Sequence, residues 1–259
     1  MSNDSHVLVE HRPDGVLSIV LARPERRNAI TVAMYAALAS AIENAADDTA
    51  IRLITLEGQG DDFTAGNDLA DFINTLPKPG SDEDIPVWRL LRALARNQVP
   101  IIAAVHGNAV GIGTTMLFHC DFVLAEDGSR FVMPFVDLGL VPEAASSLLF
   151  PRLAGRRRAA RHLLLGEPFG ASQALDMGLA SHVVPQGQLK AALTGLVAAL
   201  LAKPPEALRQ TQRLLRREDT QEILERIELE NGHFGERLQS EEVKQAIAAF
   251  FAARAKSPA

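Results

Sequence analysis

Cysteine is nearly absent from this sequence, because the 259 residues include a single one, Cys120. One cysteine excludes a disulfide within the chain and any metal site that needs several cysteine ligands. Long apolar runs are also missing, since no window reaches the ~18 uninterrupted apolar residues of a membrane span. Residues 1–15, MSNDSHVLVEHRPDG, lack the apolar core of a signal peptide, and we therefore expect a cytoplasmic protein.

An excess of positive charge is missing as well. The net charge of −6 argues against nucleic acid as the main partner but says little about small anionic ligands, which respond to local charge. The arginine-rich residues 156–161 (RRRAAR) have no interleaved aromatic residues and are most simply a solvated helix face. With 47% hydrophobic and 22% charged residues, and no internal repeat, the composition is that of a soluble globular protein.

Strand and helix patterns alternate through the first 155 residues. Asp14-Gly15 is a hairpin signal between two short apolar runs, residues 7–10 and 16–21. From Thr31 the apolar residues follow a helical period, and a second helix is predicted to begin near Gly113. Further strands are predicted at residues 51–56, 101–107, 121–125 and 130–132. This alternation predicts an α/β fold with parallel strand pairing.

The remainder of the chain is predicted to be helical. The expected helices cover residues 156–165, 172–177, 188–202, 205–217, 220–231 and 240–255. The last of them presents one apolar face, which either the body of the chain or another subunit would cover. Earlier in the chain, residues 77–86 (PKPGSDEDIP) are the best candidate for a mobile loop or lid, although an ordinary surface loop has the same composition.

Two turns are candidates for binding an anion through backbone N–H groups. In DFTAGNDL, from Asp62, the small residues Ala65-Gly66 join an extended segment to a helix predicted to begin near Asn67. A plain strand–turn–helix junction with a capping residue explains this stretch equally well. In HGNAVGIGTTM, residues 106–116, three glycines follow a buried strand, but the spacing fits neither a dinucleotide fingerprint nor a phosphate loop. If the two turns are adjacent in space, they can form a two-donor oxyanion hole.

One carboxylate stands in an unusually apolar setting. Residues 131–150, FVMPFVDLGLVPEAASSLLF, contain only Asp137 and Glu143 as ionisable groups. A buried carboxylate without a partner is costly, so such a group is normally paired, neutral or functional. The alternative is a partly exposed loop residue, or a cap for a helix beginning at Ala144.

The chain resembles the enoyl-CoA hydratase/isomerase (crotonase) superfamily over nearly its whole length. The matching segments are LARPERRNAI from Leu21, DFTAGNDL from Asp62, PIIAAVHGNAVGIG from Pro100, LGLVPEAASS from Leu138 and LLLGEPFGASQALDMGLASHVV from Leu163. The resemblance implies the crotonase (ClpP-like) α/β fold of turned ββα units over residues 1–200. It also implies a helical C-terminal oligomerisation region at residues 201–259, which would build a homotrimer or homohexamer.

The same resemblance implies the site. Family members bind acyl-CoA thioesters and stabilise a thioester enolate with two backbone N–H groups, which by position are those of Ala65 and Ile112. Ile112 stands where the family often has glycine, which affects the shape of the pocket rather than the N–H donor. The residues expected to line the substrate are Arg26, Gly66, Asn67, Asp68, Leu69, Gly111, Thr115 and Phe135. Arg26 would lie near the phosphates and pantetheine of CoA, although a solvated surface arginine is an equal alternative.

The carboxylates indicate the reaction. Family hydratases use two glutamates to hold a water, and this sequence has Thr115 and Phe135 at those positions. Glu143 instead matches the single base of the Δ3,Δ2-enoyl-CoA isomerase branch. We therefore expect an isomerase that converts 3-enoyl-CoA to 2-enoyl-CoA in fatty-acid or related metabolism, with Glu143 moving the proton. No metal or redox cofactor is implied, and coenzyme A is part of the substrate. The alternatives are an enoyl-CoA hydratase (a lyase), another enolate-forming reaction, or a non-catalytic acyl-CoA-binding subunit.

Overall fold

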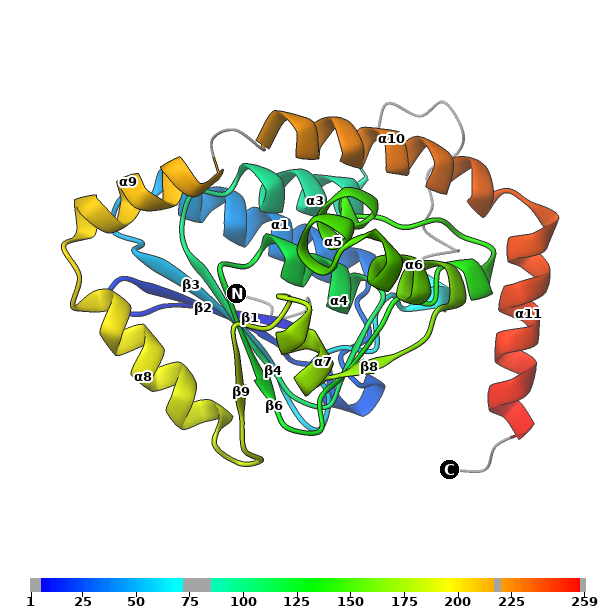
Figure 1. Ribbon diagram of the computed structural model, residues 1–259, viewed down its shortest axis with the longest axis horizontal. Coiled ribbons are helices and arrows are strands. Elements are labelled where there is room, and N and C mark those ends of the chain that lie inside the picture. Colours follow the sequence, from blue (N-terminus) through cyan, green and yellow to red (C-terminus); the bar gives the residue numbers. More distant parts are fainter. Residues whose placement is uncertain (1–5, 72–84, 217–219, 257–259) are drawn as a thin grey trace.

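The computed structural model describes residues 6–71, 85–216 and 220–256. Its centre is a six-stranded sheet in the order β1-β2-β3-β4-β6-β9 (Figure 1). The strands are β1 (Val7–His11), β2 (Val16–Leu21), β3 (Leu53–Gly58), β4 (Ile101–Val105), β6 (Phe122–Glu126) and β9 (His182–Val184). Only β1 and β2 pair antiparallel; the other neighbours are parallel. The predicted hairpin and the predicted parallel α/β pairing are therefore confirmed.

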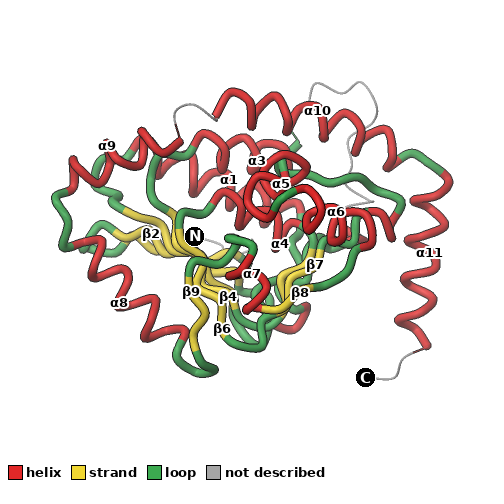
Figure 2. Tube along the Cα trace, in the orientation of Figure 1, coloured by secondary structure: helices red, strands yellow, loops and turns green. Residues whose placement is uncertain are grey.

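A second, smaller sheet has the order β5-β7-β8. Its strands are β5 (Asn108–Val110), β7 (Arg130–Val132) and β8 (Phe169–Gly170), and Figure 2 shows β7 and β8 to the right of the main sheet. Phe131 and Phe169 stack across the β7–β8 pair with ring centroids 5.4 Å apart, and Phe150 stacks on Phe169 at 5.9 Å. Because Phe150 belongs to the helix at Ser146–Ala154, these aromatic contacts join the small sheet to that helix.

Helices cover both faces of the main sheet. They are α1 (Val32–Asp47), α3 (Pro86–Arg96), α4 (Ile112–Thr115), α5 (Ser146–Ala154), α6 (Arg156–Leu165), α7 (Ala171–Asp176), α8 (Leu189–Leu201), α9 (Pro205–Arg216), α10 (Thr220–Leu238) and α11 (Glu241–Lys256). Short 3₁₀ turns lie at Pro24–Arg26 (η1), Met116–His119 (η2) and Val136–Leu138 (η3). The side chain of Thr31 caps α1 by accepting from the Met34 N–H, as the helical period beginning there predicts.

Alternation along the strands divides the core between these helices. Ile54 and Ile101 belong to the large cluster that includes the apolar faces of α1 and α3. Leu53 and Ile102, their immediate neighbours, pack on the opposite face against α8. Because successive strand residues point to opposite faces, β3 and β4 are buried on both sides, as expected for parallel strands with helices on each face.

Helix α3 was missed in the sequence analysis. Residues 77–84 of the predicted loop lie outside the described residues, and its last residue, Pro86, begins α3. Pro86 suits a first helical position, and Val87, Leu90, Leu91 and Leu94 follow at helical spacing and are buried. The sequence analysis assigned Pro86 to the Pro-, Gly- and acid-rich loop, and it did not follow the helical spacing of the apolar residues that come after it.

The C-terminal helices fold back over the rest of the chain. Helix α10 runs along the top of the molecule and packs against α3 and α5 (Figure 1). It extends seven residues past its predicted end at Asn231. In α11, Val243 is buried against the backbone of Gly139. Within the described residues no single helix is long and apolar enough to span a membrane; α8 and α9 meet that criterion only together, and they are bent by 105°.

Gly107 is a position where the fold requires glycine. Its φ is +58°, and an added Cβ would overlap the carbonyl oxygen of Asp61. We expect Gly107→Ala to lower the free energy of unfolding by about 3 kcal/mol. Gly128→Ala is the matched control, because Gly128 also has a positive φ but an added Cβ there meets nothing within 4 Å. Urea unfolding followed by the fluorescence of the single tryptophan, Trp88, measures both, and equal losses would contradict the steric argument.

Candidate active site

The structure brings the two glycine-containing turns together. Thr64 and Ala109 form a parallel bridge between them. The Thr64 N–H donates to the Asn108 carbonyl at 3.0 Å, and the Val110 N–H donates to the Thr64 carbonyl at 3.0 Å. Gly66 (φ +83°) lies so close to this partner that an added Cβ would stand 2.6 Å from the Val110 carbonyl oxygen. The adjacency that an oxyanion hole requires is therefore present.

Asn28 fixes the first turn to the segment that precedes it in the chain. Its side-chain amide is fully buried and donates to the carbonyls of Gln59 at 2.7 Å and Asp62 at 2.8 Å. In return the Thr64 hydroxyl donates to the Asn28 carbonyl at 2.6 Å. The PERRN and DFTAGNDL segments thus form one hydrogen-bonded unit, and the sequence analysis did not identify Asn28 as its centre.

The predicted donor Ala65 does not have a free N–H. The Ala65 N–H donates to the Arg27 carbonyl at 2.8 Å, and the Gly66 N–H donates to Thr64 Oγ1 at 3.1 Å. The Asn67 N–H is the first in this turn that meets no acceptor among the described residues. The prediction of Ala65 was therefore wrong by two positions, because it could not account for a hydrogen bond that Ala65 donates to a residue 38 positions earlier.

The second predicted donor, Ile112, has an available N–H. Ile112 is the first residue of α4, where helix geometry leaves N–H groups without an intrahelical acceptor. The Gly111 N–H donates to the Val132 carbonyl, and the N–H groups of Thr114 and Thr115 donate to the Gly111 carbonyl. The Ile112 N–H has no acceptor in the described part of the chain. Gly111 therefore anchors the turn instead of offering a donor itself.

The single tyrosine, Tyr35, connects the first turn with Glu143. It projects from α1, is 1% exposed, and its hydroxyl donates to Asn67 Oδ1. Burial, and secondarily the negative charge of Glu143, raise the pKa of Tyr35 well above its ordinary value, so it stays a donor. The sequence carries a signal for this residue, because Tyr35 is a polar-tipped residue within the apolar face of α1.

Glu143 is buried, with 4% of its surface exposed. Its pKa is raised from 4.5 to about 8, chiefly by burial and secondarily by the charge of Glu230, while the Thr115 hydroxyl acts in the opposite direction. Thr115 faces the carboxyl without reaching good hydrogen-bond geometry, so Thr115 Oγ1 and Glu143 Oε1 both lack a partner within the described residues. Phe135, at the other hydratase position, is also buried. The site thus contains a proton-binding carboxyl in an apolar setting.

Glu143 belongs to a strained turn before α5. The two following residues, Ala144 (φ +58°) and Ala145 (φ +55°), adopt the left-handed conformation that non-glycine residues rarely take. The Ser146 hydroxyl donates to the Glu143 carbonyl at 2.6 Å, and His119 Nε2 donates to the Ala144 carbonyl at 2.8 Å. Burial lowers the pKa of His119 to about 4, so this ring is neutral. The Ser146 hydroxyl therefore holds the backbone of Glu143.

A second buried carboxylate, Glu230 of α10, completes the turn. Its oxygens accept the Ala145 N–H at 2.6 Å and the Ser147 N–H at 3.0 Å. The sequence analysis missed Glu230 because it lies 87 positions from Glu143. A signal was available, since Ile223, Ile227, Glu230 and Phe234 follow one another at helical spacing. An acidic residue therefore interrupts an apolar stripe.

Other predicted substrate-lining residues lie around the first turn. Asp68 forms an ion pair with Arg23 at 2.7 Å; burial opposes ionisation, but this hydrogen-bonded pair outweighs it and the pKa of Asp68 is lowered. Asp68 therefore already has a structural partner. Leu69 is half-buried and begins a short helical segment, two residues later than predicted. Arg26 is exposed in η1, next to the Arg27 carbonyl that receives the Ala65 N–H.

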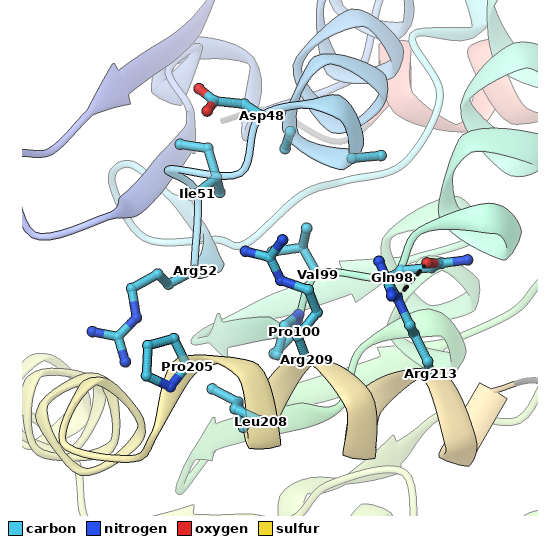
Figure 3. Close-up of a pocket in the computed structure, with 12 residues that line it drawn as sticks. Asp48, Ile51, Arg52, Gln98, Val99, Pro100, Pro205, Leu208, Arg209 and Arg213 are labelled. Carbon is cyan, nitrogen blue, oxygen red and sulfur yellow. Dashed lines mark hydrogen bonds between the residues drawn. The ribbon is translucent and has the colours of Figure 1, made fainter.

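A separate hollow lies at the opposite end of the sheet. It is lined by residues preceding β3 and β4, such as Arg52 and Pro100, and by Arg209 and Arg213 of α9 (Figure 3). Its arginines are engaged with the protein itself. Arg213 donates to Gln98 at 3.0 Å, and Arg52 and Arg209 donate to backbone carbonyls. This hollow therefore binds α9 to the sheet and is not part of the site around Glu143.

Comparison with known proteins identifies the class. A family model described as enoyl-CoA hydratase/isomerase matches residues 11–257. The 1,2-epoxyphenylacetyl-CoA isomerase of Escherichia coli (strain K12) is 33% identical over 95% of this chain and 96% of its own. Enoyl-CoA delta isomerase 2 of Rattus norvegicus is 32% identical over 93% of this chain and 62% of its own. The solved structure of an enoyl-CoA hydratase/isomerase from Pseudoalteromonas atlantica T6c superposes with a TM-score of 0.90 at 40% identity, covering 98% of this chain and 100% of that one.

The fold is therefore the crotonase fold, as expected. The chain belongs to the enoyl-CoA hydratase/isomerase family, whose members act on acyl-CoA substrates.

The raised pKa of Glu143 makes a prediction about stability. The folded protein binds this proton more tightly than the unfolded chain, whose glutamate titrates near 4.5, so the folded state loses stability as the pH rises from 4.5 to about 8. Glu143→Gln removes this titration. We therefore expect the free energy of unfolding of Glu143→Gln, measured relative to that of the wild type, to increase by roughly 3 kcal/mol between pH 5 and pH 8. Urea unfolding at the two pH values measures it; an equal difference at both would mean that Glu143 titrates normally.

Proposed function

We propose that the protein moves the double bond of a 3-enoyl-CoA to give the 2-enoyl-CoA, with Glu143 carrying the proton. The observation that supports this most is the buried Glu143 carboxyl, which faces Thr115, while Thr115 and Phe135 stand at the two positions where the resemblance implies glutamates in hydratases. The rat relative named enoyl-CoA delta isomerase is consistent with it.

The reaction needs one base and one anion site. The Glu143 carboxylate removes a proton from C2 of the thioester, and the electrons move into a dienolate whose negative oxygen accepts from the N–H groups of Asn67 and Ile112. Glu143, now protonated, returns the proton to C4, so the mass of the substrate is unchanged. A donor of this kind contributes roughly 3–4 kcal/mol to transition-state stabilisation. Tyr35 supports the first donor by holding the Asn67 side chain.

Hydration is disfavoured by the same arrangement. A hydratase requires two carboxylates that share a water over the thioester. Both oxygens of Glu230 already accept backbone N–H groups, so Glu230 is not available for this task. Phe135 adds apolar surface where the second hydratase glutamate would stand.

A second candidate is isomerisation of an epoxide such as 1,2-epoxyphenylacetyl-CoA. It is favoured by the Escherichia coli relative of that name, which is 33% identical over 95% of this chain. Both candidates use the CoA thioester and its oxyanion site, so turnover of each substrate by the purified protein distinguishes them.

Glu143→Gln tests the assignment of the base. The amide cannot accept the C2 proton, and we expect kcat for a 3-enoyl-CoA to fall by about 10²- to 10⁴-fold while substrate binding persists. Conversion is followed by the ultraviolet absorbance of the conjugated thioester and by mass. Glu10→Gln, an exposed change on β1, is the control and should keep full activity. A gain of water by a 2-enoyl-CoA would instead identify a hydratase, and unchanged turnover in Glu143→Gln would exclude Glu143 as the base.

The pH dependence of the wild type provides a further check. The reaction begins with the ionised form of Glu143, whose pKa is raised by burial to about 8. We therefore expect kcat/KM to rise about tenfold per pH unit below pH 8 and to level off above it. Stopped-flow rates in constant ionic strength buffers measure this limb, and a limb near pH 4.5 would show that the carboxyl is solvated.

A further inference from the structure

Glu230 lies where α5 needs an acceptor. Ala145 is the residue before the first turn of α5 and has no side-chain oxygen, so it cannot cap the helix. Glu230, 5% exposed, supplies the missing acceptors from α10 by binding the N–H groups of Ala145 and Ser147. A carboxylate at a helix start is also favoured by the helix dipole. This cap therefore comes from a distant helix.

The cap acts on a turn that would otherwise relax. A left-handed conformation is strained for alanine, so residues 144 and 145 keep it only while their neighbours enforce it. Three groups do so: Glu230 from α10, His119 from η2 and Ser146 from α5. Glu143 directly precedes the two alanines. A change at Glu230 is therefore transmitted through one or two peptide units to the position of the Glu143 carboxyl.

Glu230 also contributes charge. The groups that face Glu143 are Tyr35 from α1, Thr115 from α4 and Glu230 from α10, and none of these is a cation. The pKa of Glu230 is raised to about 7, because burial outweighs the opposing effects of its hydrogen bonds from Ser147 and Ala145 and of the positive charge of Arg226. The two carboxyls therefore titrate in an overlapping range, and ionisation of one opposes ionisation of the other.

We infer that Glu230 is a positioning residue, which holds Glu143 in its strained turn through the N–H groups of Ala145 and Ser147 and brings a second buried carboxyl to that turn. This inference rests on the proposed function of Glu143 as the proton carrier. Glu230 does not touch the substrate in this role, because both of its oxygens face the backbone of α5.

Glu230→Gln removes the charge and leaves one acceptor oxygen. We expect the limb of the pH–rate profile to move to lower pH, since less repulsion opposes the ionisation of Glu143. The plateau value of kcat should fall about ten- to a hundredfold because the turn loosens, with KM within twofold. Glu228→Gln is the matched control: it makes the same change two residues away on α10, at an exposed carboxylate paired with Arg92. It should move neither the limb nor the plateau.

Glu230→Asp separates the two roles and covers the case in which Glu230→Gln does not fold. The shorter side chain keeps the charge but cannot reach both N–H groups, so the plateau should fall while the limb stays in place. A purely structural role for Glu230 predicts lower stability or kcat in both variants with the limb unmoved. That result, or an unchanged plateau and limb in Glu230→Gln, would overturn the inference.

A readout without substrate keeps the test independent of the proposed function. Unfolding of the wild type, Glu143→Gln, Glu230→Gln and the double variant is measured at pH 5 and pH 8. If the carboxyls repel each other, the pH-dependent gain from Glu143→Gln is smaller in the Glu230→Gln background. Equal gains would contradict the coupling. If no variant, including the wild type, converts a 3-enoyl-CoA, the proposed function fails while this cycle still decides whether Glu230 acts on Glu143.

Discussion

The Glu143 carboxyl is buried without a cationic partner among the described residues. Ionising it there costs free energy, and the surrounding structure has to hold it in place despite that cost. A carboxyl in such a setting binds its proton tightly and is stable as the neutral acid. The structure does not relieve this cost, since the ionisable groups that interact with Glu143 are Glu230 and Tyr35, and neither carries a positive charge. It instead holds the group in place with a strained turn and contacts from separate elements. An expensive, rigidly held carboxyl is what a proton carrier near neutral pH requires.

The N–H groups that we propose as oxyanion donors depend on a different principle, the close approach of two backbone segments. The Thr64–Ala109 bridge satisfies most polar groups of both turns and leaves the N–H groups of Asn67 and Ile112 without an acceptor in the described chain. Backbone donors are independent of side-chain identity, so an isoleucine at position 112 still offers its N–H group. Under the proposed function, the side chains at positions 115, 135 and 143 set the reaction while the backbone N–H groups serve any thioester enolate.

The sequence predicts those parts of the molecule whose determinants are local. The hairpin at Asp14-Gly15, the start of α1 at Thr31 and the exposed arginines of α6 follow from a few neighbouring residues, and the structure confirms them. Which N–H of a turn is free is not a local property. Ala65 is engaged because Arg27 is folded against it, and the donor therefore shifts to Asn67.

Glu230 lies between these cases. Its place on the apolar stripe of α10 is visible in the sequence, since the buried residues Ile227 and Phe234 stand three and four positions away. The pattern shows that the residue is out of place but not what it touches. That depends on how α10 packs against α3 and α5, which involves contacts across more than 80 residues. A charged residue on an apolar stripe is therefore a signal to look for a distant partner.

The placement of Glu230 also bears on the division of the chain. The division predicted from the sequence places a core at residues 1–200 and an oligomerisation region at residues 201–259. In the structure α10, which belongs to the second region, packs on α3 and α5, and its carboxylate caps the helix that follows Glu143. The turn that carries Glu143 therefore depends on hydrogen bonds from a helix beyond residue 200. If α10 shifts, those two hydrogen bonds are the direct route by which the shift reaches the turn.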